Sequence, residues 1–325
     1  MPADASSLPT HYGYHRPTRL RKGDVIGIVA PSSPQRDDER LRRGIRYFES
    51  LGYRVRLGEH LWERHGYLAG TDEERLDDLN AMIRDPQVRM IIAGRGGYGM
   101  TRIIERVDYA ALGRARKIVV GFSDVTALNF AALAKSKLVT FSGAMPGVDF
   151  ADATVDAFAE ESFWAAVTST KALGIVPSPD DTPITPLARG RAEGWLLAGN
   201  LTLAAALCGS RWLPKTKGAI MLLEEIGEEA YRVDRLLSQL WNAGAMRGLS
   251  GLALGAFTDA APRRVSVDPL PIEEVFAEYV RRAAVPAIGG ISYGHIARKL
   301  TLPLGVRARL DGTRGTLRLV ESGVC

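Results

Sequence analysis

Ser123 is the first candidate for chemistry, because it lies where a predicted buried strand becomes a predicted helix. Ile118-Val119-Val120 is a short apolar run typical of a parallel strand covered on both faces, and Val125 to Leu133 carries apolar residues at helical spacing. Backbone N–H groups at a helix N-terminus are free donors that can stabilise an oxyanion forming near such a serine. The alternative interpretation is that Ser123 or Asp124 only caps the helix, since both residue types are preferred caps.

A serine becomes a nucleophile when a histidine takes its proton and an acid orients that histidine. Of the five histidines, His295 alone follows a predicted strand end beside a glycine. The acid candidates, Glu224 and Glu225, follow the apolar run Ile220 to Leu223. Taken singly, the histidine could be an ordinary loop residue and the acids a helix cap. Three strand-end residues of complementary types, in the order Ser, Glu, His, together predict a serine hydrolase.

The turn around Ser123 argues against one common serine-hydrolase scaffold. Gly121-Phe-Ser-Asp-Val125 lacks the second glycine of the G-x-S-x-G turn that defines the α/β-hydrolase nucleophile. A different scaffold is therefore expected.

A second loop, Gly94-Arg-Gly-Gly-Tyr-Gly99, follows the predicted strand Val88 to Ala93. Its free N–H groups, including that of Gly96, and the Arg95 guanidinium suit a substrate carboxylate. The alternative is a dinucleotide loop, because the glycines also spell G-x-G-x-x-G. The acid expected at the end of the next strand is not evident, which argues against nucleotide binding.

These residues need a scaffold that gathers strand ends at one edge. Strands alternate with helices of about 12 to 15 residues, which indicates βαβ units and a mainly parallel sheet with helices on both faces, so we predict an α/β fold. The expected elements are a strand at 24–30, a helix at 37–51, a strand at 53–57, a helix at 71–85 with a capping box from Thr71 and Glu74, and the strand at 88–93.

A stretch rich in Pro, Ser, Asp and Thr divides the chain. We expect an N-terminal domain over 1–170, a linker over 171–191, and a C-terminal α/β domain over 192–325 that ends in a β-hairpin around Asp311-Gly312. The other expected elements of the second domain are helices at 201–208, 231–242 and 272–283, and strands at 219–223, 252–257 and 287–291.

Composition narrows the classes of protein. The chain has 325 residues, 46% hydrophobic and 24% charged, and its net charge of +5 comes from scattered arginines, so no nucleic-acid partner is expected. No stretch approaches the roughly 18 uncharged apolar residues of a membrane span. Because the leader Met1 to Lys22 is polar and unlike a signal peptide, we expect a cytoplasmic protein. Cys208 and Cys325 give neither a disulfide framework nor zinc spacing, and no metal is expected.

Six motifs occur in order along nearly the whole chain: Gly23 to Pro31, Gly94 to Gly99, Gly121-Phe-Ser-Asp-Val-Thr126, Gly199-Asn200-Leu201, Leu223-Glu224-Glu225 with Val233-Asp-Arg235, and Gly294-His295 with Leu300 to Gly305. In these motifs the chain resembles the LD-carboxypeptidase family of serine peptidases, which includes murein tetrapeptide carboxypeptidases and microcin C immunity proteins. The resemblance implies that Ser123 is the nucleophile, Glu224 orients the base His295, and the N–H groups of Gly97 and Asp124 form the oxyanion hole.

The same resemblance implies an enzyme that removes the C-terminal D-alanine of murein tetrapeptides, works without a cofactor, and forms a homodimer. One departure is Phe141-Ser-Gly-Ala-Met-Pro146, where many relatives carry a His-Gly-Pro-Met-like stretch. The nearest alternative is a microcin C immunity-type amidase, which would need an aromatic platform for a nucleotide base. A third interpretation is a catalytically idle protein that binds wall fragments.

Overall fold

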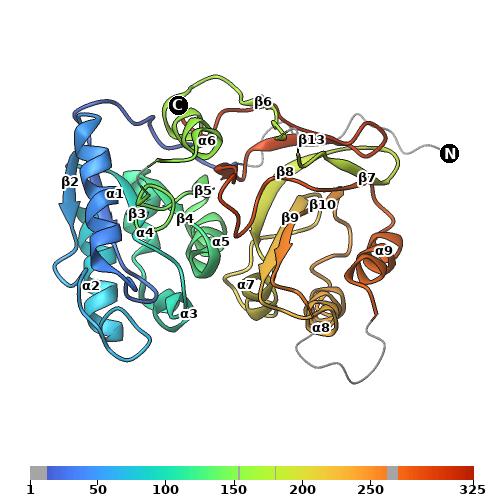
Figure 1. Cartoon of the computed structure of the whole chain (residues 1–325), viewed down its shortest axis with the longest axis horizontal. Helices are drawn as coiled ribbons and strands as arrows, with labels where there is room; N and C mark the ends of the chain where they lie inside the picture. Colours follow the sequence, from blue (N-terminus) through green and yellow to red (C-terminus); the bar gives the residue numbers. More distant parts are fainter. Residues whose placement is uncertain (1–12, 153, 180, 262–269) are drawn as a thin grey trace.

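The computed structural model describes residues 13–152, 154–179, 181–261 and 270–325. His11 and the rest of the leader before residue 13 lie outside the described residues. Two β-sheets organise the described chain, one mainly from its first half and one mainly from its second half. Figure 1 shows the two sheets beside each other, each with its own helices. The predicted α/β fold is confirmed.

The first sheet has six strands in the order β12-β5-β4-β3-β1-β2. All neighbours are parallel except β12, which runs antiparallel to β5. The strands β1, β3 and β4 at its centre are almost entirely buried, as their continuous apolar runs predict. The bounds are β1 Val25–Val29, β2 Arg54–Leu57, β3 Val88–Ala93, β4 Ile118–Gly121, β5 Thr140–Ser142 and β12 Leu302–Leu304.

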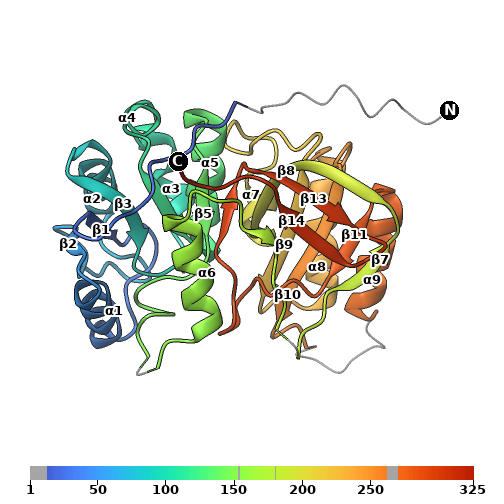
Figure 2. The ribbon, with the colours of Figure 1, turned by 90° about the horizontal axis from the view of Figure 1, so that it is seen from above.

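Helices cover both faces of this sheet. Figure 2 shows α1 and α6 on one side, and α2, α4 and α5 on the other. The capping box predicted for the second helix is present, with Thr71 and Glu74 each bonded to the other's backbone. The bounds are α1 Asp38–Ser50, α2 Asp72–Arg84, α3 Met100–Ile103, η1 Ile104–Arg106, α4 Tyr109–Ala115, α5 Thr126–Ser136 and α6 Ala157–Thr168.

The second sheet has eight strands in the order β6-β14-β13-β8-β9-β10-β11-β7. Strands β8 to β11 are parallel neighbours, and the antiparallel hairpin of β13 and β14 confirms the expected turn around Asp311. The bounds are β6 Gly174–Ile175, β7 Thr185–Ala188, β8 Arg191–Asn200, β9 Ile220–Ile226, β10 Gly251–Thr258, β11 Ala287–Gly289, β13 Arg307–Asp311 and β14 Thr316–Leu319.

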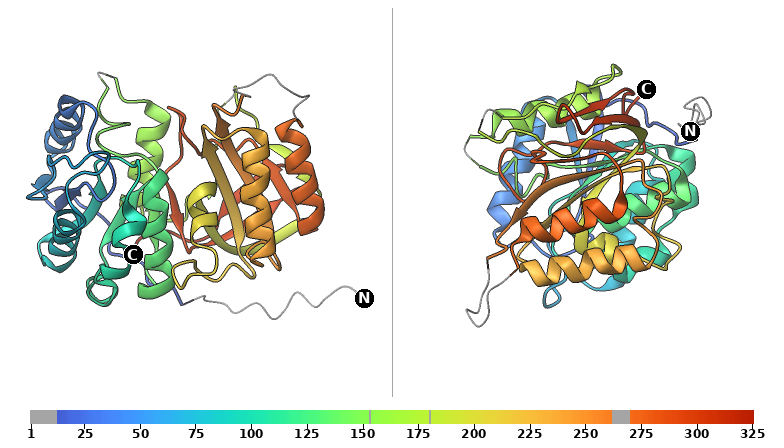
Figure 3. Two further views of the ribbon diagram at one scale, coloured as in Figure 1. Left: turned by 90° about the horizontal axis from the view of Figure 1, so that it is seen from below. Right: turned by 90° about the vertical axis from the view of Figure 1, so that its right-hand side faces the viewer.

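Three helices pack against one face of the second sheet, and Figure 3 shows α8 and α9 lying side by side. They are α7 Leu201–Ala206, α8 Ala230–Asn242 and α9 Ile272–Ala283. No helix among those that the structure describes is long and apolar enough to cross a membrane.

Two details differ from the sequence-based expectation. The segment 171–191 is not only a connection, because it supplies both edge strands of the second sheet, β6 and β7. Glu224 and Glu225 do not follow β9 but lie within it, since the strand continues to Ile226. Pairing with β10 through Glu225 and Ile226 extends the ladder past the apolar run.

The C-terminal part of the chain returns to the first sheet through β12. Leu302 pairs with Ser142 and Leu304 with Thr140, so a strand from after His295 completes the sheet that carries Ser123. Gly143 lies at this junction, where a Cβ atom would come within 2.2 Å of the Thr301 Oγ1 and 2.5 Å of its Cα. The two sheets are therefore joined by backbone pairing as well as by packing.

We predict that Gly143→Ala lowers the free energy of unfolding by about 1–3 kcal/mol, the usual cost of overpacking a buried site. Gly113→Ala in α4 is the matched control, because its added Cβ would meet nothing closer than 3.3 Å. Alanine's better helix propensity, roughly 1 kcal/mol, should offset that contact. Urea denaturation of both variants checks this, and equal midpoints for the two would contradict it.

Candidate active site

Ser123 lies at the sharp turn between β4 and α5, in a short 3₁₀ segment that spans Ser123–Val125. Its φ angle is 62°, a left-handed conformation that non-glycine residues rarely adopt. The neighbouring residues are in ordinary regions, with Phe122 extended and Val125 helical. The strain is thus confined to the residue that was predicted to be the nucleophile.

The structure brings together the three predicted catalytic residues. His295 Nε2 lies 3.0 Å from Ser123 Oγ, and His295 Nδ1 lies 2.7 Å from Glu224 Oε2. The Glu224 side chain is 0% exposed, whereas the His295 side chain is 21% exposed. A continuous hydrogen-bond chain therefore runs from a buried carboxylate to a hydroxyl that solvent can reach. The Phe122 ring packs on the imidazole at 4.9 Å between ring centroids.

Two glycines allow the backbone to turn so tightly at Ser123. A Cβ on Gly121 would lie 2.2 Å from Val125 Cγ1. A Cβ on Gly96, in the glycine-rich loop, would lie 2.9 Å from Ser123 Cβ and 3.0 Å from the Phe122 carbonyl oxygen. The glycine-rich loop and the serine turn therefore pack directly on each other, with no room for a side chain between them.

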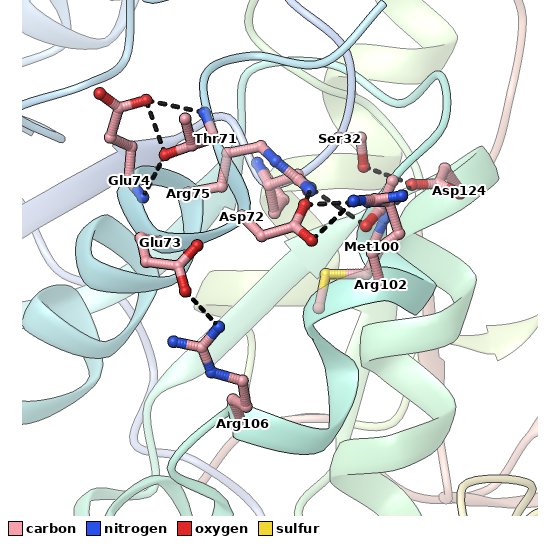
Figure 4. Close-up of polar contacts among 12 residues, drawn as sticks. Ser32, Thr71, Asp72, Glu73, Glu74, Arg75, Met100, Arg102, Arg106 and Asp124 are labelled. Carbon is pink, nitrogen blue, oxygen red and sulfur yellow. Dashed lines mark hydrogen bonds and ion pairs between the residues drawn. The ribbon is translucent and has the colours of Figure 1, made fainter. Parts of the chain in front are cut away.

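The Asp124 side chain does not cap the helix that follows it. Its Oδ2 accepts hydrogen bonds from the Ser32 hydroxyl at 2.6 Å and from the Met100 N–H, the first residue of α3, at 2.8 Å (Figure 4). Burial raises the pKa of this carboxyl, and the hydrogen bonds and Arg75 oppose the shift. The capping interpretation is thus wrong for α5: Asp124 joins the serine turn to α3 and to the loop after β1.

The predicted oxyanion donors lie in these two turns. Within the described residues, neither the Gly97 N–H nor the Asp124 N–H donates a hydrogen bond to another group of the chain. Gly97 has a φ of 122°, and the next N–H, of Tyr98, is bonded to the Ser33 hydroxyl at 3.1 Å. The Gly97 conformation is therefore fixed by the loop after β1.

Arg95, the predicted carboxylate ligand, is half-buried, and its Nη1 donates to the Pro34 carbonyl oxygen at 3.0 Å. Burial, and to a lesser degree the nearby Arg36, lowers the pKa of its guanidinium. One guanidinium edge is thus used to hold the loop after β1.

Glu224 and Glu225 have different partners, although they are adjacent. Glu225 Oε2 accepts from the Thr202 N–H in the first turn of α7 at 2.8 Å, so the helix-terminus interpretation is right for Glu225. Glu224 faces His295 instead. Asn200 Nδ2 donates to both carboxylates, at 3.1 Å to Glu224 and 2.9 Å to Glu225. Sequence reasoning gave Asn200 no role, although it lies in one of the motifs that carried the resemblance.

The stretch at 141–146 contacts the segment that carries His295. Ser142 Oγ lies 2.7 Å from Tyr293 Oη, and the Ala144 N–H donates to Thr301 Oγ1 at 3.1 Å. Tyr293 is fully buried, and burial together with the charge of Glu224 raises the pKa of its phenol well above the usual value. The phenol therefore stays neutral two residues before the imidazole.

A cavity of about 730 Å³ opens beside His295, on the side of the loop after β5. Its charged lining includes a buried ion pair, Lys299 with Asp149 at 2.8 Å, and a more exposed pair, Arg40 with Asp152 at 2.7 Å. Across the part of the chain that the structure describes, no group of three or more His, Cys, Asp and Glu residues is arranged to hold a metal ion.

Three tryptophans that could be tested as a platform for a nucleotide base have other neighbours. Trp195 is 6% exposed in the core, Trp164 stacks on Tyr53, and Trp62 lies under the Arg42 guanidinium. The exposed rings near the glycine-rich loop are instead Tyr98 and Tyr67, whose centroids are 5.6 Å apart.

A hydrogen-bond chain from glutamate through histidine to serine, here contributed by both sheets, is a site of the serine-hydrolase type. Two family models match this chain, the LD-carboxypeptidase N-terminal domain over residues 26–143 and the LD-carboxypeptidase C-terminal domain over residues 193–310. The chain belongs to the LD-carboxypeptidase family.

Individual relatives cover nearly the full chain. A probable murein peptide carboxypeptidase of Bacillus subtilis is 34% identical over 95% of each chain. The solved muramoyltetrapeptide carboxypeptidase from Oxalobacter formigenes is 33% identical with a TM-score of 0.79, over 92% of this chain and 98% of that one. The microcin C7 self-immunity protein MccF of Escherichia coli is 27% identical over 93% of this chain and 94% of its own. A wild-type apo structure of MccF gives a TM-score of 0.87 at 25% identity, over 96% of this chain and 100% of that one.

We predict that Gly96→Ala lowers kcat by about 10- to 100-fold, because displacing catalytic atoms by about 1 Å can cost that much. The added Cβ would push on Ser123 Cβ. Gly94→Ala in the same loop is the control, because its Cβ would come no closer than 3.2 Å to the end of the Gln35 side chain and 3.4 Å to that of Leu41. Steady-state hydrolysis by the two variants checks this, and equal kcat values would show that the contact with Ser123 does not matter.

Proposed function

We propose that this protein is a serine LD-carboxypeptidase that hydrolyses the L,D bond before the C-terminal D-alanine of murein tetrapeptides. The observation that carries the proposal is the chain from Glu224 through His295 to Ser123, at 2.7 and 3.0 Å, ending on a serine in a left-handed turn. The relatives named as murein peptide carboxypeptidases support the choice of substrate.

In the proposed mechanism, His295 Nε2 takes the Ser123 proton as Oγ attacks the carbonyl carbon of the scissile bond. The N–H groups of Gly97 and Asp124 stabilise the resulting oxyanion. Glu224 keeps the proton of His295 on Nδ1 and stabilises the imidazolium. His295 then protonates the leaving nitrogen of D-alanine, and a water molecule that it activates releases the tripeptide from Ser123.

The substrate's terminal carboxylate is proposed to bind Arg95 together with the N–H groups of the loop that contains Gly96. A guanidinium has more donors than the single bond to Pro34 uses, and its planar fork suits a carboxylate. The cavity beside His295 leaves room for the rest of the peptide.

The proposal extends to organisation and location. We propose that residues 1–170 form the domain that carries the nucleophile, residues 192–325 the domain that carries Glu224 and His295, and 171–191 the connection. The two separate family matches support this division. We further propose a cytoplasmic homodimer that acts in cell-wall recycling.

The enzyme should release D-alanine from a murein tetrapeptide with a chelator present, and His295→Ala should lower kcat by about 10³-fold or more. The matched control is His60→Ala, because His60 also contacts a carboxylate, Asp78 at 3.0 Å, outside the site. It should keep kcat within about twofold. D-Alanine release is measured for both variants. Equal losses of kcat would show that His295 has no catalytic role.

Arg95→Ala should lower kcat/KM for the tetrapeptide by about 10-fold or more, because a charge-assisted hydrogen bond contributes roughly 1.5–3 kcal/mol. For the same peptide with a C-terminal amide, Arg95→Ala should lower kcat/KM much less. Arg64→Ala is the control, since Arg64 also donates to a backbone carbonyl of the loop after β1, at Gln35. If Arg95→Ala affects both peptides equally, the role of Arg95 is to hold the loop.

A second candidate function is cleavage of an aminoacyl-nucleotide conjugate, favoured by the TM-score of 0.87 to MccF. Its platform for a base would be Tyr98, 49% exposed and next to Gly97, with Tyr67 beside it. Turnover of an aminoacyl sulfamoyl adenylate without D-alanine release from the tetrapeptide would select this function.

A further inference from the structure

Asn200 contacts both halves of the site. It ends β8 and is 3% exposed. Its backbone N–H donates to the hydroxyl of Thr126, the first residue of α5, at 3.1 Å. Its side-chain Nδ2 donates to Glu224 at 3.1 Å and to Glu225 at 2.9 Å. One residue thus links the helix that follows Ser123 to the carboxylate behind His295.

The packing around Asn200 leaves little freedom for this link. A Cβ on the preceding residue, Gly199, would lie 2.5 Å from Thr126 Cγ2 and 3.0 Å from the Phe130 ring. The end of β8 therefore lies directly on α5. Asn200 also pairs in register with Glu224 of β9, which places its amide beside that carboxylate.

The Glu225 carboxylate has more hydrogen-bond donors than the Glu224 carboxylate. Glu225 accepts from Thr202 N–H at 2.8 Å and from Ile226 N–H at 2.9 Å, besides Asn200. Glu224 Oε2 is hydrogen-bonded to His295 Nδ1. Across the described residues, Asn200 Nδ2 is the one hydrogen-bond donor to Glu224 Oε1. Removing that amide would leave a buried oxygen without a partner.

The Glu224 and Glu225 side chains are 0% and 4% exposed, so water cannot replace a hydrogen-bond donor that either carboxylate loses. The shared Asn200 amide therefore fixes the orientation of both carboxylates. A Glu224 carboxylate that turned away from His295 would neither stabilise the imidazolium nor fix its tautomer.

We propose that Asn200 is a positioning residue of the catalytic site, which holds the Glu224 carboxylate toward His295 and fixes it relative to the helix that follows Ser123. The inference rests on the proposed function only in requiring that Ser123 is the nucleophile.

Asn200→Asp separates this role from a structural one. The Asn200 side-chain oxygen also caps α7, accepting from Leu203 N–H at 3.2 Å. Aspartate has the same shape and is an equally good cap, so the cap is retained while the shared donor is lost. Asn200→Ser is the second variant: it caps as well, adds no charge, and is too short to reach the carboxylates as asparagine does.

We expect Asn200→Asp to lower kcat by about 100-fold or more, with KM within about threefold, because the lost interaction acts on the transition state. The acid limb of kcat/KM against pH should move to higher pH, because the substitution adds a third carboxyl group to a buried site. Asn200→Ser should lower kcat with a smaller displacement of that limb. The measurement is D-alanine release from the tetrapeptide over a pH series.

The matched control is Asn80→Asp. Asn80 is 7% exposed and, like Asn200, uses its amide on both sides, donating to Arg106 O at 3.2 Å and accepting from Asp108 N–H at 2.9 Å. It lies on α2, away from the triad, so kcat and the pH profile should stay within about twofold of wild type.

A second readout, the rate at which a fluorophosphonate labels Ser123, does not depend on the substrate. If the wild type labels but releases no D-alanine, the proposed substrate is wrong, and the pH dependence of labelling still decides the role of Asn200. The inference is overturned if both Asn200 variants keep the wild-type pH profile. It is also overturned if their loss of kcat only follows a loss of thermal stability. A wild type that neither labels nor hydrolyses overturns both proposals.

Discussion

The left-handed backbone of Ser123 is the constraint on which the rest of the site depends. For a non-glycine residue, that backbone conformation costs about 1–3 kcal/mol of strain energy, and it persists only where the surrounding structure enforces it. Here the enforcement comes from a central strand of the first sheet and from two glycines, Gly121 and Gly96, that pack against the turn without a side chain. Because of this turn, the Ser123 hydroxyl points at His295, which lies in the segment that follows β11 of the second sheet.

Holding that histidine requires the two sheets to be joined. His295 follows β11 of the second sheet, and the chain then re-enters the first sheet as β12. Backbone pairing therefore fixes the chain on both sides of His295. Behind it, Glu224 lies in β9, beside the end of β8 that packs on α5. Strand β9 positions Glu224, the turn after β4 positions Ser123, and paired strands flank the segment that carries His295, as a preorganised site needs.

Much of the fold could be predicted from local patterns. Apolar runs and helical spacing predicted β1, β2, β3 and β4 of the first sheet, α2 with its capping box, and the terminal hairpin, because these features depend on residues close in sequence. The residues Ser123, Glu224 and His295 could be proposed because each follows or extends an apolar run. The structure brings them together, and their catalytic roles stay a prediction.

The remaining features depend on contacts between distant residues. The pairing of β12 with β5 and the strands within 171–191 have no periodic signal, since each strand is at most four residues long. A helix cap is an open alternative for Asp124 in the sequence alone, because the partners of its side chain, Ser32 and Met100, are far away in sequence. No local pattern indicates a role for Asn200, because its partners are also distant in sequence. Only its motif, Gly199-Asn200-Leu201, could have drawn attention to it.

The measurement that tests the central claim most directly is D-alanine release from a murein tetrapeptide by the wild type and by Ser123→Ala, at equal concentrations of folded protein. The account predicts release by the wild type and a loss of several orders of magnitude in the variant, because the attacking oxygen is gone. Equal release by both proteins would contradict it, since the hydroxyl held by His295 would then not be the nucleophile.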